Sequence, residues 1–184
     1  MQTNRMALVG QSSSLLILLQ QTVIVSDKFE YDGEINEYIR QARYDDIERI
    51  AEILVFNYRL NFYPIFQDDS FYFEELKVSK QMDNYTNDLN NIWVYDDGVV
   101  KGFIQIEKDE VKKLFVEPAL QGKSIGAELL EYMIDEKNVK FLWALEKNTK
   151  AIAFYKRHGF DVTNDKKYEE DTTEFLVRME RQIK

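Results

Sequence analysis

The chain has 184 residues, of which 45% are hydrophobic and 14% aromatic, a composition typical of a folded domain rather than a disordered chain. Its formal net charge of −9 argues against nonspecific binding to nucleic acid, which requires a basic surface. The absence of cysteine excludes disulfides, thiolate metal sites and a cysteine acyl intermediate. A single histidine cannot build a histidine-rich metal centre, so we expect no metal.

The first 34 residues differ in character from the rest of the chain. Residues 15–25 are apolar but too short to cross a membrane, and no small-residue cleavage motif marks a signal peptide. We therefore expect an N-terminal extension at 1–34, a domain at 35–184, no membrane attachment and a cytoplasmic location. The extension is either an added strand or helix on the domain, a leader, or an arm that docks on a partner subunit.

The first predicted elements are a short strand at 37–40 and a helix at 45–58 whose apolar residues recur with helical spacing. Residues 59–70 contain Pro64 and predict a loop, and residues 71–84 predict a second helix. The stretch between these helices is dense in aromatic side chains: Tyr58, Phe62, Tyr63, Phe66, Phe71, Tyr72 and Phe73.

The second half of the chain predicts strands alternating with helices. A hairpin at 92–95 and 99–107 surrounds Asp96-Asp97-Gly98, a strong turn signal. Strands are then predicted at 111–116, 141–146, 160–162 and 173–179, with helices opening near Ile125 and covering 149–158. This order predicts an α/β fold with a mixed central sheet and helices on both faces.

Residues 121–127 connect the strand at 111–116 to the helix that opens near Ile125. The first N–H groups of a helix have no intrahelical partner, and the helix dipole adds about half a positive charge there. The loop therefore predicts a seat for a diphosphate. It is not a Walker A loop, because Glu117 stands where that motif requires glycine, and no G-x-G-x-x-G motif is present.

A second motif covers residues 148–160. Asn148 is a predicted N-cap and Gly159 a predicted residue just past the helix end. The motif has the pattern Asn-x-x-Ala-x-x-Phe-Tyr followed by Gly-Phe, and Asn148 follows Gln121 by 27 residues.

The two motifs, in this order, resemble the signatures of the GNAT superfamily of N-acetyltransferases. The coenzyme A signature of that family is Gln/Arg-x-x-Gly-x-Gly/Ala after Val-x-Pro. Here Val116-Glu117-Pro118 precedes Gln121, and Gly126 takes the second glycine position. Ser124 replaces the first glycine. The serine can still offer its backbone N–H to the phosphate if its φ is negative. The resemblance extends from residue 37 to about residue 181.

The resemblance implies that acetyl-CoA enters between two central parallel strands that splay apart. The backbone of Leu114 and Val116 would then contact the pantetheine arm, and Asn148 would contact the same arm or serve only as a cap. The remaining residues that the resemblance places at the diphosphate are Gln121 at the rim, then Gly122, Lys123, Ser124, Gly126 and Ala127.

For catalysis, the resemblance implies that the Tyr155 hydroxyl protonates the departing thiolate. A thiol pKa near ~8.5 and a phenol pKa near ~10 are close enough for proton exchange. The family's glutamate base, eleven residues before Gln121, corresponds to Glu110. The alternative base five residues before Asn148 is absent, because that residue is Trp143. Glu107, Glu146 or a chain of waters stay open as alternatives to Glu110.

The expected function is transfer of an acetyl group from acetyl-CoA to a primary amine by direct attack in a ternary complex. The aromatic segment at 58–73 and an acidic late loop suit a cationic or apolar amine. That loop contains Asp165, Glu169, Glu170 and Asp171. Two alternatives remain: a coenzyme A-binding module without catalysis, or an interaction module built around the N-terminal arm. The family's habit also favours a homodimer.

Overall fold

The computed structural model describes residues 36–170 and 172–182. The extension at 1–34 therefore lies outside the described residues, as does Asp171 of the predicted late loop.

The described chain forms one seven-stranded sheet in the order β1-β2-β3-β4-β5-β7-β6. Its strands are β1 (Ile39–Gln41), β2 (Ile92–Asp96), β3 (Val100–Glu107), β4 (Glu110–Val116), β5 (Phe141–Leu145), β6 (Phe160–Tyr168) and β7 (Phe175–Arg181). Neighbouring strands pair antiparallel except β4 and β5, which are parallel. The predicted mixed sheet is confirmed.

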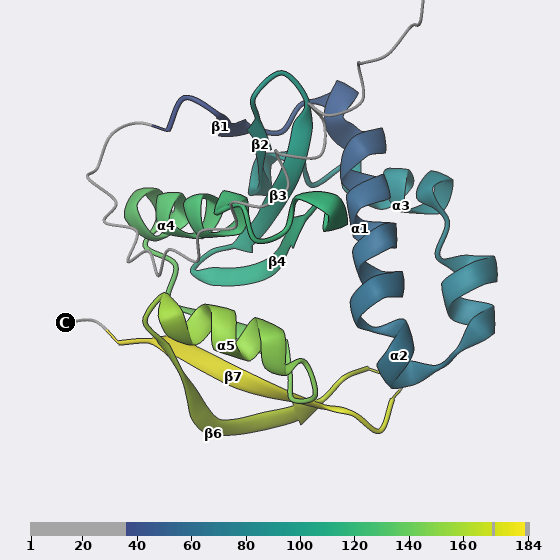
Figure 1. Cartoon of the computed structure of the whole chain (residues 1–184), viewed down its shortest axis with the longest axis vertical. Coiled ribbons are helices and arrows are strands. Elements are labelled where there is room, and N and C mark those ends of the chain that lie inside the picture. Colours follow the sequence, from purple (N-terminus) through teal and green to yellow (C-terminus); the bar gives the residue numbers. More distant parts are fainter. Residues whose placement is uncertain (1–35, 171, 183–184) are drawn as a thin grey trace, which may run out of the picture. The chain divides into compact units, whose positions relative to one another are not determined.

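Helices cover both faces of the sheet, as predicted (Figure 1). The helices are α1 (Ile47–Asn61), α2 (Tyr63–Phe66), α3 (Val78–Tyr85), α4 (Ile125–Lys137) and α5 (Thr149–Arg157). One core cluster joins the sheet to α4 and α5 and includes Leu129, Met133 and Phe160. The other joins it to α1 and α3 and includes Ile50, Leu54 and Phe103.

Three predicted elements were wrong in part. Residues 63–66 form α2 rather than a loop, because Pro64 lies in the first helical turn, where a missing N–H costs no hydrogen bond. The helix predicted at 71–84 is two elements, a π-helical turn at Ser70–Glu75 and then α3. The strand predicted at 160–162 extends to Tyr168, so Asp165 lies in a strand and not in a loop.

β4 and β5 pair over two residues only, Glu110 with Phe141 and Val111 with Leu142. Beyond that point the strands separate, and the edge of β4 that faces β5 has no strand partner in the described chain. The pairing of β4 with β3 shifts at the same place and leaves Lys112 without an opposite residue, as in a β-bulge. We call the gap between the two strands from Lys112 onward the β4–β5 opening.

Gly102 on β3 permits the close approach of α4 to the sheet. A Cβ added there would lie 3.0 Å from the Phe115 carbonyl oxygen and 3.2 Å from Ile125 Cγ2. A Cβ at Gly126 would come no closer than 3.5 Å, to Val116. Backbone cannot move aside as a flexible side chain does, so only Gly102 is sterically required.

We therefore expect Gly102→Ala to lower the free energy of unfolding by about 1–3 kcal/mol, as overpacking does in cores. Gly126→Ala, the matched control, should change it by less than ~1 kcal/mol, because its methyl group meets only ordinary contacts. Urea denaturation measures both. Equal effects of the two substitutions would contradict the packing argument.

Candidate active site

The loop before α4 exposes a row of backbone donors. Gly122 and Ser124 have φ values of +79° and +63°, so the condition that Ser124 keeps a negative φ is not met. Ser124 is the N-cap of α4, and its carbonyl accepts from the Glu128 N–H at 2.9 Å. The N–H groups of residues 122–127 have no hydrogen-bond partner within the described chain. They form what we call the amide cradle.

A buried asparagine fixes this loop to the sheet. Asn57 of α1 is 1% exposed, and its Nδ2 donates to the Ile53 carbonyl at 2.8 Å and to the Val116 carbonyl at 2.9 Å. Gln121 Nε2 donates to Asn57 Oδ1 at 2.9 Å. Gln121 thus points inward and holds the loop. Asn57 was not among the site residues predicted from the sequence; the only signal was a polar residue at helical spacing on the apolar face of α1.

The backbone of β4 presents polar groups to the β4–β5 opening. The Glu117 N–H donates to the Lys101 carbonyl of the β3 side at 2.8 Å. Because bonded and non-bonded pairs alternate in antiparallel strands, Leu114 and Val116 turn their backbone groups away from β3. The Val116 carbonyl is taken by Asn57, so its N–H and the polar groups of Leu114 remain for the opening.

α5 begins with the predicted cap. Asn148 Oδ1 accepts from the Ala151 N–H at 3.1 Å, and Gly159 follows the helix with φ +82°. Asn148 Nδ2 has no partner among the described residues, so the same side chain keeps one free donor. The phenyl ring of Phe154 lies 3.8 Å from the position of a Cβ on Gly126, which brings the two motifs together.

Tyr155 is 9% exposed and packs against Phe154 and Phe160, with ring centroids 5.2 and 6.0 Å away. Burial raises its pKa well above the usual value for a phenol, because the low-dielectric surroundings disfavour the charged form. The phenol therefore stays protonated across the physiological range. Its hydroxyl makes no hydrogen bond within the described chain and is free to donate to a ligand.

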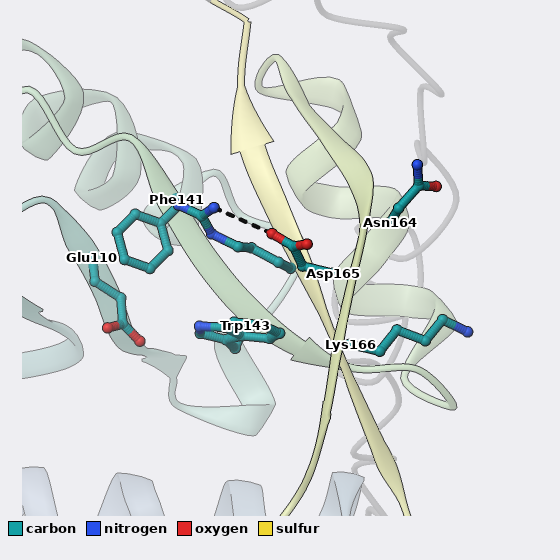
Figure 2. Close-up of a pocket in the computed structure, with 7 residues that line it drawn as sticks. Glu110, Phe141, Trp143, Asn164, Asp165 and Lys166 are labelled. Carbon is teal, nitrogen blue, oxygen red and sulfur yellow. Dashed lines mark hydrogen bonds and ion pairs between the residues drawn. The ribbon is translucent and has the colours of Figure 1, made fainter.

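An open pocket of about 690 Å³ lies where the β4–β5 opening begins (Figure 2). Its lining residues are Glu110, Phe141, Trp143, Asn164, Asp165, Lys166 and Arg178. Phe141 and Trp143 alternate along β5 with Leu142 and Ala144, which belong to the core under α4 and α5. The pocket is therefore on the opposite face of the sheet from those helices.

Ion pairs organise the charged groups of the pocket. Glu110 Oε1 lies 3.1 Å from Lys112 Nζ. The Arg178 guanidinium stacks on Phe141 at 4.4 Å and lies 3.5 Å from Asp165, as the dashed line in Figure 2 shows. The side chains of Asn164 and Lys166 extend away from Trp143 in the same view.

The two carboxylates considered as alternative bases are both exposed, and each forms an ion pair with a lysine. Glu107 lies 3.8 Å from Lys112, and Glu146 lies 2.5 Å from Lys166. Neither lines the pocket, so Glu110 is the one of the three candidate bases that does.

Part of the aromatic segment faces the same side of the sheet. Tyr58 and Phe62 pack edge-on against Phe115 of β4, with centroids 5.8 and 6.3 Å apart. Burial raises the pKa of Tyr58 to about 12, and the negative charge of Glu169 adds to the shift. The segment at 58–73 and the late loop therefore approach each other. Phe71 and Phe73 remain exposed at the surface.

The described residues contain no group of three or more metal-binding side chains. Within residues 36–170 and 172–182, no helix combines the length and the apolarity needed to span a membrane. Lys123 is exposed at the amide cradle, without an ion pair in the described chain.

Comparison with known proteins matches the same part of the chain. A model of the GNAT acetyltransferase domain matches residues 88–162. The peptidyl-lysine N-acetyltransferase YjaB of Salmonella typhimurium is 34% identical over 62 residues, which cover 34% of this chain and 43% of that relative. The match therefore spans less than half the length of the relative.

Solved structures extend the likeness to the whole described domain. The apo form of YjaB from Escherichia coli superposes with a TM-score of 0.60 at 20% identity, over 77% of this chain and 95% of that one. The PaiA N-acetyltransferase of Thermoplasma acidophilum, in complex with coenzyme A, gives a TM-score of 0.57 at 22% identity, over 76% and 96%.

These structures establish the fold, and the domain model covers the amide cradle, the β4–β5 opening and both sequence motifs. Residues 88–162 therefore resemble the GNAT acetyltransferase domain, and the described domain shares the fold of these solved structures.

Proposed function

We propose that the protein transfers an acetyl group from acetyl-CoA to a primary amine by direct attack in a ternary complex. One observation carries the proposal. Unpartnered N–H groups at residues 122–127 lie at one end of a gap in the sheet, and a pocket containing a carboxylate lies at the other. An anionic cofactor bound at the first end can extend its reactive group to the second.

The dimensions agree with coenzyme A. Its arm between the diphosphate and the sulfur, when extended, spans about as far as four peptide residues, ~14 Å. β4 covers about the same length between Val116 and Lys112, at ~3.3 Å per residue. When the diphosphate of coenzyme A binds the amide cradle, its thioester lies near Lys112. This is the end of the β4–β5 opening at which β4 and β5 still pair and the pocket lies. The coenzyme A complex of the PaiA structure supports this choice of cofactor.

The remaining cofactor contacts follow from groups left without partners. The diphosphate accepts hydrogen bonds from the amide cradle, and Lys123 adds a positive charge. Amide groups of the arm pair with the free backbone groups of Leu114 and Val116, and Asn148 Nδ2 donates to the arm. Gln121 does not contact the cofactor in this arrangement; it holds the loop in place through its hydrogen bond to Asn57.

Tyr155 acts as the acid for the thiolate. Its raised pKa makes full ionisation of the phenol costly, and the same apolar surroundings also disfavour the thiolate. A neutral phenol donates a hydrogen bond to the sulfur as negative charge develops there, and then gives up its proton.

Glu110 accepts the proton from the acceptor ammonium. Of the two carboxylates that line the pocket, it is the one on β4, whereas Asp165 pairs with Arg178. The acceptor amine enters over Trp143 and Phe141. The name of the Salmonella relative, a peptidyl-lysine acetyltransferase, supports a lysine side chain as one acceptor.

A second candidate is a coenzyme A-binding domain without catalysis. The strained φ of Ser124, at a position where the family signature has glycine, favours it. Release of coenzyme A in the presence of a panel of amines distinguishes the two functions. Tight binding of acetyl-CoA without amine-dependent release would favour the second.

We expect Tyr155→Phe to lower the rate of amine-dependent coenzyme A release about 10²-fold, the usual contribution of an acid–base group. Its affinity for coenzyme A should be unchanged, because the hydroxyl acts on the sulfur and not on the diphosphate. Thiol release and calorimetry measure the two quantities. An unchanged rate would remove Tyr155 from the mechanism.

We expect Ser124→Gly to raise the free energy of unfolding by about 0.5–1 kcal/mol and to keep coenzyme A binding, because glycine adopts a positive φ without a Cβ penalty. Ser124→Ala retains the strain and is the control. A loss of stability in the glycine variant would show that the serine hydroxyl, and not its backbone, matters at this position.

A further inference from the structure

Lys167 of β6 places its ammonium 4.4 Å from the centre of the Trp143 ring. The register explains the contact. Lys167 pairs with Leu176, and Trp143 pairs with Arg178, on the face of β7 opposite the buried Val177. These side chains therefore share the face of the sheet that carries the pocket.

Trp143 is the first residue of β5 after the last pair with β4, Val111 with Leu142. It therefore borders the closed end of the β4–β5 opening. If the proposed function holds, this is where the extended arm of acetyl-CoA delivers its thioester. Lys167 is not itself one of the lining residues of the pocket, but its contact with Trp143 places its amine beside that pocket.

The other lysine amines near this place are held by carboxylates. Lys112 pairs with Glu110 at 3.1 Å, and Lys166 pairs with Glu146 at 2.5 Å. Lys167 has no ion pair with any described residue, and its side chain is exposed. An exposed contact between a cation and an aromatic ring is worth only about 0.5–1 kcal/mol. The ring therefore positions the amine without preventing it from moving to react.

We propose that Lys167 is acetylated by the acetyl-CoA bound to the same molecule. The inference rests on the proposed function. The Lys167 ammonium loses a proton to Glu110 or to water, and its nitrogen attacks the thioester carbon. The nitrogen gives up a second proton to water as the amide forms. A C–N bond forms, the C–S bond breaks, and the thiolate takes a proton from Tyr155, which regains one from solvent. The products are acetyl-Lys167 and free coenzyme A.

Acetylation has a direct physical consequence at the pocket. The amide is neutral and no longer binds the face of the Trp143 ring as a cation. The ring then becomes free for an external amine. Modification of Lys167 and access of other acceptors are therefore linked through one aromatic side chain.

The test is incubation of the full chain with acetyl-CoA, followed by peptide mapping by mass spectrometry. We expect one acetyl group at Lys167, formed with a first-order rate constant that does not change on dilution of the protein. Lys166 is the internal control, because it adjoins Lys167 but pairs with Glu146, and it should stay unmodified. Heat-unfolded protein gives the background of chemical acetylation.

Two variants sharpen the result. Lys167→Arg keeps a cation over the ring and should abolish the modification. Trp143→Leu removes the ring and should slow the modification of Lys167 about two- to fivefold, the equivalent of an exposed cation–aromatic contact. Circular dichroism verifies that each variant is folded.

The outcomes separate this inference from the proposed function. Acetylation of added amines with Lys167 unmodified would overturn the inference and leave the proposed function standing. Labelling that is equal at Lys166, equal in unfolded protein, or faster at higher protein concentration would also overturn it. Failure of the protein to bind acetyl-CoA would overturn both.

Discussion

The geometry of the site depends on the carbonyl group of Val116, the last residue of β4. Asn57 and Gln121 both direct amide groups to this oxygen, at 2.9 and 3.4 Å, and Gln121 also donates to Asn57. A satisfied buried network of this kind costs little, whereas loss of one member leaves a buried polar group unpaired. It connects α1, the end of β4 and the loop before α4. The amide cradle and the β4–β5 opening are thereby held in one arrangement.

The opening itself follows from how β4 pairs. Two residues pair with β5, a bulge at Lys112 shifts the register against β3, and the remaining edge stays without a strand partner. An unpaired sheet edge normally invites another strand. Here the edge is enclosed between α4 and α5 on one side and the pocket on the other. It suits an extended ligand with amide groups, and its length matches the arm of coenzyme A.

Most of the fold could be predicted from local features of the sequence. The hairpin at Asp96-Asp97-Gly98, the start of α4 and the Asn148 cap each rest on a few neighbouring residues, and the structure confirms them. The continuation of β6 past Val162 could not be predicted, because its side chains are almost all polar and exposed and show no alternation. The break between the π-helical turn and α3 was missed because apolar residues continue through it.

In the candidate site too, residues within a contiguous motif could be predicted, whereas residues that act through distant contacts could not. The motifs located the amide cradle and Tyr155, because each motif is contiguous in sequence. Asn57 and Gly102 act through residues far away in the chain, Val116 and Ile125 among them, and no local pattern marks such contacts. The condition on the φ of Ser124 failed for a similar reason: the loop conformation is imposed by its attachment at both ends, and the serine tolerates it.

We propose that the amide cradle binds the diphosphate of acetyl-CoA. Calorimetric titration with acetyl-CoA of the wild type, Gly126→Ala and Gly126→Trp tests it most directly. A methyl group at residue 126 meets only ordinary contacts with Val116 and Phe154, whereas an indole is too large for that space and would extend into the region beside the amide cradle. The account predicts binding to the wild type and the alanine variant and none to a folded tryptophan variant. Equal binding to all three would place the cofactor elsewhere, and no binding to the wild type would contradict the account as a whole.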